Sequence, residues 1–197
     1  MNVDTKKLTL IIALAAVTVA LNPVFTGIAI PAPYAPFLYY QIWEIPIVTA
    51  FALINLRSAV AIAFMNMTIL IVVFPGALIT GPFYNLLAVL SMLLGIYVSY
   101  RLLTLKNNSI KTPNATLKKQ TIQIATATIL GVALRTGLMA IVNYAVLRYE
   151  PPIGYAMPET AILAATPLIA LFNSTLALYT VPIGHIVANA VKKNLKL

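Results

Sequence analysis

Long apolar runs dominate this chain and limit the folds open to it. Five of them carry few charged residues and are separated by shorter links: residues 8–24, 45–74, 82–103, 121–147 and 160–191. A helix needs roughly 20 apolar residues to cross about 30 Å of hydrocarbon. With 61% hydrophobic and 9% charged residues, the chain has too little polar surface for a soluble globule. The sequence therefore predicts an all-α integral membrane protein with a single transmembrane domain, residues 1–197.

The run at residues 45–74 is too long for one span. As one helix it would measure roughly 45 Å at 1.5 Å per residue, so it either tilts steeply or turns at residues 55–58. With the turn, the chain has six helices with both termini on one side, and eleven of its thirteen Lys and Arg residues fall there. Basic residues prefer the cytoplasmic side. We expect cytoplasmic termini in a multi-pass cell-membrane protein, with helices at about residues 8–24, 45–56, 59–74, 82–103, 121–147 and 160–191.

The link between the first two helices, residues 29–46, is rich in proline and aromatic residues. Its four prolines exclude one regular helix, because each lacks an N–H and its ring clashes with the preceding turn. Its rings favour the boundary between lipid and water, and they are Tyr34, Phe37, Tyr39, Tyr40 and Trp43. We expect this link to be irregular backbone that forms an extracellular lid. In the last run, Pro167 and Pro182 predict a kink or a re-entrant stretch.

Motifs for catalysis are absent from the sequence. There is no phosphate-binding loop, nucleophile elbow, His cluster or carboxylate pair, and the lack of cysteine excludes disulfides and thiolate metal sites. We therefore expect no enzyme activity, no metal and no cofactor. The charge of +9 follows from the topology and does not indicate nucleic-acid binding. Because the spans contain no Asp or Glu to carry protons, energy for uphill transport would have to come from a partner.

Four amides stand out in the predicted spans: Asn66, Asn85, Asn143 and Asn173. Each falls in the half of its helix nearer the outer face. A single such amide can equally serve an interhelical hydrogen bond, worth about 1 kcal/mol or less in membranes. Four amides at one level beneath an aromatic lid favour a pocket for a polar heteroaromatic ligand, because amides bind ring edges and aromatic side chains stack on ring faces.

Two further polar residues fall inside the spans. Arg135 lies near the middle of its run, where an unpaired charge is costly. It can contact a ligand or have a structural role, and the sequence does not decide between the two. His185, near the inner end of the last run, is interpreted as a structural residue.

The first run carries a face of small residues. Ala13, Ala16 and Ala20 recur at spacings of three and four, so they share one side of a helix and allow another helix to approach closely. This face can serve either packing within the bundle or docking of a partner protein. A protein without its own energy source needs such a docking surface.

These parts resemble the membrane-embedded substrate-binding (S) components of energy-coupling factor (ECF) vitamin transporters, most closely the riboflavin type. The resemblance covers nearly the whole chain. It is carried by Ala16-x-x-x-Ala20, the proline-rich link ending Glu44-Ile45-Pro46, Gly81-Pro82-Phe83-Tyr84-Asn85-Leu86-Leu87, Asn143-Tyr144-Ala145-Val146-Leu147, and Pro167 to Asn173. It implies six helices, capture of a vitamin from outside beneath the first link, and docking of the first helix on a transmembrane coupling protein driven by two ATPase subunits.

The resemblance also implies site residues. Asn143 and Asn173 match flavin-contacting positions best, followed by Phe37, Leu38 and Glu44 in the link. Some positions depart from the family pattern: Gln41 replaces an acidic residue, Glu44 replaces an Asp, and Leu176 stands where a lysine is expected. Bound riboflavin would be substrate and not cofactor. An S component for another vitamin, such as cationic thiamine near the acidic residues, and a standalone permease are the alternatives.

Overall fold

The computed structural model describes residues 5–27, 30–73, 80–106 and 115–195. Its elements are α1 (Thr5–Ala20), α2 (Pro23–Thr26), β1 (Ile30–Ala32), β2 (Ala35–Tyr40), α3 (Ile45–Leu53), α4 (Leu56–Val73), α5 (Gly81–Lys106), α6 (Ala115–Val146) and α7 (Glu159–Leu195). Four helices, α4 to α7, are long and apolar enough to cross a membrane by length and composition. The predicted helical class with several apolar helices is confirmed. The 16 residues of α1 and 9 of α3 are shorter than a span, so six crossings stay a prediction.

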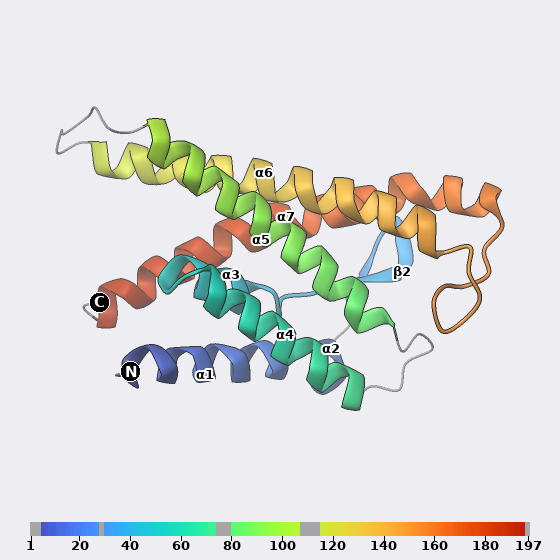
Figure 1. Ribbon diagram of the computed structural model, residues 1–197, viewed down its shortest axis with the longest axis horizontal. Coiled ribbons are helices and arrows are strands. Elements are labelled where there is room, and N and C mark those ends of the chain that lie inside the picture. Colours follow the sequence, from blue (N-terminus) through green and yellow to red (C-terminus); the bar gives the residue numbers. More distant parts are fainter. Residues whose placement is uncertain (1–4, 28–29, 74–79, 107–114, 196–197) are drawn as a thin grey trace.

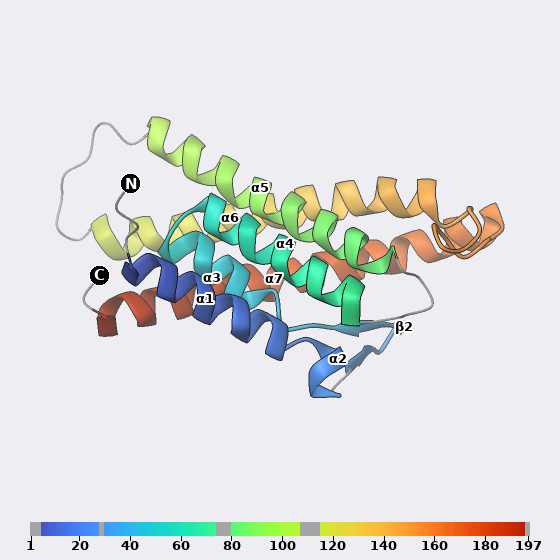
Figure 2. The same cartoon turned by 60° about the horizontal axis from the view of Figure 1, so that its bottom comes forward.

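Five helices form a closed ring. Helix α6 packs between α5 and α7, α7 contacts α3, and the pairs α3–α4 and α4–α5 complete the circuit. Helix α1 packs on the outside of this ring, against α3 and α4, and Figure 2 shows it in front of them. The main core lies inside the ring, where Ile47, Ile62, Met92 and Val181 are fully buried.

The helices run roughly along one long axis, so the molecule has two distinct ends (Figure 1). The first turn of α1 and the last turn of α7 lie at one end, and the β-strands lie toward the other, which we call the lid end. Seven described basic residues near helix ends lie at the end opposite the lid, namely Lys6, Lys7, Arg57, Arg101, Lys119, Lys192 and Lys193, whereas Arg148 follows α6 at the lid end. This arrangement agrees with the charge segregation expected from the sequence.

Asparagine caps set two of the helix boundaries. The predicted first helix runs to residue 24, but α1 ends at Ala20 because Asn22 accepts a hydrogen bond from the Val24 N–H and starts the short α2. Asn55 likewise accepts from the backbone and side chain of Ser58 at 2.9 and 3.1 Å. The long apolar run therefore turns at Ile54 and Asn55, between α3 and α4.

The proline-rich link contains regular structure, contrary to the expectation of irregular backbone. Strands β1 and β2 form an antiparallel pair in which Ile30 lies opposite Tyr40. We call residues 30–40 the lid hairpin. Its prolines are compatible with strand structure because a two-stranded sheet has only edge strands, where a missing N–H is tolerated. Ala32 and Ala35 are buried against Phe172 and Leu176 of α7, so the hairpin is packed onto the bundle.

Glycines allow two close helix contacts. A Cβ at Gly95 of α5 would lie 2.3 Å from the Leu130 carbonyl oxygen of α6, and one at Gly184 of α7 would lie 2.6 Å from a Val48 methyl group of α3. Helix α7 is continuous through Pro167 and Pro182, so it contains no re-entrant stretch, although its two halves run in different directions in Figure 1.

Candidate functional site

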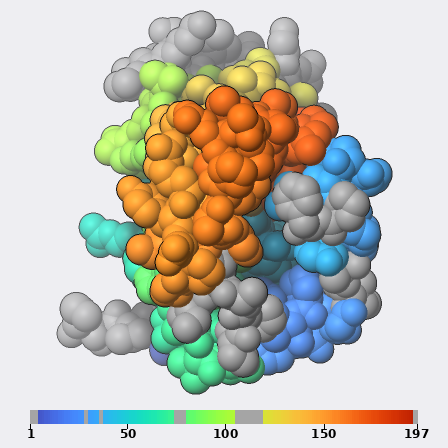
Figure 3. Space-filling model, turned by 90° about the vertical axis from the view of Figure 1, so that its right-hand side faces the viewer, coloured from blue at the N-terminus to red at the C-terminus, as the bar shows by residue number. Residues whose placement is uncertain are grey.

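A cavity of about 480 Å³ lies at the lid end of the ring. Its walls come from the lid hairpin and the residue after it, from α5, α6 and α7, and from the segment that joins α6 to α7. Figure 3 views this end and shows the surface hollowed between the orange segment around the α6–α7 link and the blue lid hairpin. Pockets of roughly 300–1,000 Å³ with mostly apolar walls and a few polar groups are typical of small-molecule sites.

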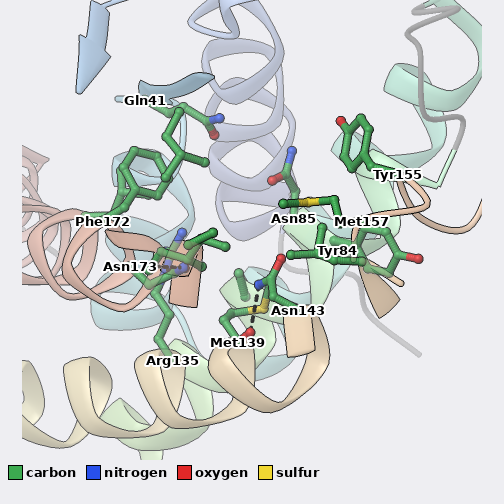
Figure 4. A pocket seen from close by; sticks show the side chains of 16 residues that line it. Gln41, Tyr84, Asn85, Arg135, Met139, Asn143, Tyr155, Met157, Phe172 and Asn173 are labelled. Carbon is green, nitrogen blue, oxygen red and sulfur yellow. Dashed lines mark hydrogen bonds between the residues drawn. The ribbon is translucent and has the colours of Figure 1, made fainter. Parts of the chain in front are cut away.

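Helical periodicity brings the wall residues together. On α6, Arg135, Met139 and Asn143 follow one another at spacings of four, so they share one face. On α7, Phe172 and Asn173 line the same cavity with their neighbours one turn away. The polar lining groups are Gln41, Tyr84, Asn85, Arg135, Asn143, Tyr155 and Asn173 (Figure 4).

A buried ion pair lies beside the cavity. The Arg135 guanidinium donates to both carboxylate oxygens of Glu44, one of them at 2.9 Å. Arg135 is 3% exposed and Glu44 is 1% exposed. The guanidinium also donates from Nε to Asn173 Oδ1 at 3.1 Å and contacts Met92 Sδ at 3.8 Å. Because the two charges neutralise each other, the cavity has no net charge from this pair.

The hydrogen bonds of two cavity amides fix their orientation. A guanidinium N–H can only donate, so the Asn173 atom that faces Arg135 is its oxygen, and the Asn173 nitrogen donates to the Ile169 carbonyl at 2.9 Å. The Asn143 nitrogen donates to the Met139 carbonyl at 2.7 Å, which leaves its oxygen pointing away from Met139 into the cavity (Figure 4). Asn85 lines the cavity and has no hydrogen-bond partner among the described residues. The cavity thus offers both donors and acceptors from neutral groups.

Tyrosine hydroxyls attach the lid hairpin and the residues after it to α7. The hydroxyls of Tyr34 and Tyr40 lie 2.8 Å apart, and each lies within 3.3 Å of Thr175 Oγ1. The Tyr40 ring also packs on Phe172 with centroids 5.4 Å apart. Further along, the Tyr179 hydroxyl donates to the Gln41 carbonyl at 2.5 Å. The hairpin is therefore closed against α7 at the edge of the cavity.

The sequence-predicted ligand residues divide into three groups. Leu38, Asn85, Asn143 and Asn173 line the cavity. Glu44 and Asn66 do not: the Glu44 carboxylate faces Arg135, and Asn66 is buried on α4 with an amide oxygen that has no partner among the described residues. Phe37 lies in β2, but its side chain falls outside the described part of the structure.

Several lining residues were not predicted as ligand contacts from the sequence. Met139 follows Arg135 and precedes Asn143 by one turn, and Phe172 adjoins Asn173, so helical spacing could have identified both. Tyr155 and Met157 come from the segment between α6 and α7. This segment folds back on the helix ends, because the Tyr155 and Met157 N–H groups both donate to the Leu147 carbonyl. No sequence signal indicates that contact.

The remaining predicted residues lie away from the cavity. Ala13, Ala16 and Ala20 are exposed on α1, whereas Ala15 and Thr18 are buried against the ring. His185 is buried; its Nε2 lies 2.9 Å from the Tyr100 hydroxyl and its Nδ1 2.8 Å from the Val181 carbonyl, which gives it structural contacts on both nitrogens. The described residues contain no group of three or more His, Cys, Asp or Glu that could hold a metal ion.

Comparison with known proteins identifies the fold. A solved S component of a bacterial ECF transporter superposes on 98% of this chain and 97% of its own length, with a TM-score of 0.62 and 20% sequence identity. At that identity the match shows a shared fold. No protein-family model matches the chain, and no curated protein does.

Proposed function

We propose that this chain is the S component of an ECF-type importer and binds a small vitamin, riboflavin first, in the cavity at the lid end. The observation that carries the proposal is the cavity of about 480 Å³, which combines neutral amides with aromatic and apolar walls. The shared fold with an S component supports the same role. The proposed ligand contacts are Leu38, Asn85, Asn143 and Asn173, with Phe37 as a further lid position.

The pairing of the acidic residue nearest the cavity with an arginine favours a neutral ligand over a cationic one. A cationic vitamin such as thiamine would be favoured by an unpaired carboxylate in the cavity. The nearest candidate, Glu44, is bound by Arg135 on both oxygens. Glu159 accepts from the Tyr144 hydroxyl, and both of these residues are exposed. The neutral amides suit the carbonyl and N–H edge of a heterocycle such as the flavin ring.

Transport would depend on partner proteins. The described helices α4 to α7 contain neither Asp nor Glu in their membrane-spanning windows apart from Glu159 at the first position of α7, so they lack the usual proton carriers. We propose that the exposed Ala13, Ala16 and Ala20 face of α1 docks on a transmembrane coupling protein, which two ATPase subunits drive. Because basic residues prefer the cytoplasmic side of a membrane, we propose that the basic end faces the cytoplasm and the lid end faces outward.

Riboflavin binding tests the proposal. The full-length chain is purified in detergent, its visible absorbance is recorded for co-purified flavin, and flavin-free protein is then titrated with riboflavin and, separately, with thiamine. We expect saturable binding of one riboflavin per chain and no saturation by thiamine. Preferential binding of thiamine would replace riboflavin as the substrate, and binding of neither would contradict the proposed ligand.

A further inference from the structure

Arg135 makes contacts with both the lid side and the ligand side of the cavity. We call residues 30–44, the lid hairpin and the four residues after it, the lid segment. Two nitrogens of Arg135 bind Glu44, the last residue of this segment and the N-cap of α3, and the Arg135 Nε binds Asn173 on α7. The guanidinium is planar and its donors have a fixed fork geometry. A shift of Glu44 therefore changes the direction of the N–H that holds Asn173.

Two contacts hold Asn173 in one orientation: the Arg135 Nε–H at its oxygen and the Ile169 carbonyl at its nitrogen. Without Arg135, only the bond to Ile169 opposes a half-turn of the amide that exchanges its oxygen and nitrogen. With Arg135 in place, the oxygen is bound, one N–H is bound to the Ile169 carbonyl, and the second N–H stays available to the cavity that Asn173 lines. Asn173 then acts as a donor toward the ligand, and Asn143 supplies the acceptor.

The state of this hydrogen-bond network can be followed through Trp43 in the lid segment. Trp43, the one tryptophan in the sequence, is 2% exposed and adjoins Glu44. Its indole N–H donates to the Gln41 side-chain oxygen, and the Gln41 carbonyl accepts from Tyr179. Trp43 fluorescence is therefore a direct signal of how the end of the lid segment is held.

We propose that Arg135 is a positioning residue, which links the end of the lid segment through Glu44 to the orientation of Asn173 and so sets the donor that the cavity presents. Arg135 itself need not bind the ligand through charge, because Glu44 neutralises it. This inference rests on the proposed vitamin-binding function, and it differs from a purely structural ion pair in one respect: its effect on binding passes through Asn173.

A double-mutant cycle with riboflavin tests this route. Arg135→Lys keeps the charge but cannot donate to Glu44 and Asn173 in the same fork geometry. We expect it to weaken riboflavin binding about tenfold in the unmodified chain and less than about threefold in an Asn173→Ala background. The matched control is Arg148→Lys, an exposed arginine over the Tyr144 ring just beyond α6, which should change neither Kd. An equal loss in both backgrounds would overturn the proposal.

A second measurement needs no ligand. In the unliganded full-length chain, Glu44→Gln and Arg135→Lys should shift the Trp43 emission to longer wavelength and increase its quenching by acrylamide, whereas Arg148→Lys should do neither. Unchanged Trp43 emission and quenching in both variants would overturn the link to the lid segment. If the unmodified chain bound no riboflavin, that result would contradict the proposed ligand, and the Trp43 measurement would still decide the link.

Discussion

Arg135 on α6 and Glu44 at the start of α3 are 91 positions apart in the sequence and form a buried pair joined by two hydrogen bonds. Removal of one partner from such a pair leaves an uncompensated charge in an apolar interior. We expect Arg135→Met to lower the free energy of unfolding by about 3–5 kcal/mol, measured by denaturant unfolding in detergent.

The double variant Arg135→Met with Glu44→Leu provides the control for that prediction. It removes both charges, so we expect it to recover most of the stability that the single variant loses. A double variant as unstable as Arg135→Met alone would show that the loss comes from packing and not from the unpaired carboxylate.

The Asn143 amide is predicted to bind the ligand. Asn143→Leu removes the oxygen that faces the cavity and should weaken riboflavin binding by about 1–3 kcal/mol, measured by calorimetry. Asn66→Leu is the matched control, because Asn66 is also a buried helical amide but does not line the cavity. Its unpartnered oxygen contributes no hydrogen bond among the described residues, so affinity and stability should not fall. An affinity loss for Asn66→Leu that equals the loss for Asn143→Leu would contradict this placement.

The closed position of the lid hairpin depends on Thr175. Thr175→Val keeps the shape of the side chain but removes the hydroxyl that meets Tyr34 and Tyr40. We expect riboflavin to dissociate about fivefold faster or more, since the loss of one or two hydrogen bonds destabilises the closed lid by about 1 kcal/mol or more. Stopped-flow measurement of Trp43 fluorescence can follow this rate. Thr166→Val on the same helix removes only a bond to its own helix and should leave the rate unchanged; equal acceleration by both variants would exclude the lid as the cause.

The exposed face of α1 is predicted to serve assembly. Replacing Ala16 and Ala20 with leucine should leave riboflavin binding unchanged and prevent co-purification with the coupling protein, because bulky residues keep the helices apart. Ala15→Leu is the contrasting variant: Ala15 is 5% exposed and faces the ring, so overpacking there should cost about 1–3 kcal/mol of stability. Loss of ligand binding in the Ala16 and Ala20 variant would instead assign that face to internal packing.

The contact at Gly95 offers a test of the fold itself. Gly95→Ala would place a methyl group 2.3 Å from the Leu130 carbonyl oxygen, whereas nothing lies within 4 Å of a Cβ at Gly137. We expect Gly95→Ala to destabilise the chain by about 1–3 kcal/mol or more and Gly137→Ala to be neutral or stabilising through helix propensity. Equal melting temperatures of the two variants in detergent would contradict the close packing of α5 on α6.

The sequence predicted features that depend on local pattern. The apolar runs gave the helical class, the polar group at residues 55–58 gave the turn between α3 and α4, and helical position brought Asn85, Asn143 and Asn173 to one cavity. Asn66 was expected at the same level of the helix bundle, but it lies on a face of α4 that does not line the cavity. The rotation of each helix about its axis depends on packing partners, which a single sequence does not specify.

Contacts between residues that are distant in the sequence could not be predicted. The partner of Arg135 is Glu44, and nothing in the spacing of these two residues indicates that the last residue of the lid segment reaches the C-terminal half of α6. The lid hairpin was missed because prolines exclude helix but do not distinguish an irregular loop from a short strand pair. Tyr155 lines the cavity because its segment folds back through backbone hydrogen bonds to Leu147, and the sequence did not predict this contact either.

Uptake of riboflavin into proteoliposomes tests the central claim most directly. Vesicles that contain the chain alone are compared with vesicles that also contain the coupling protein and the two ATPase subunits, each with and without ATP on the cytoplasmic side. The account predicts that the chain alone binds riboflavin without accumulating it, and that accumulation requires both the partners and ATP. Accumulation above the external concentration by the chain alone would contradict the S-component function and identify a standalone transporter.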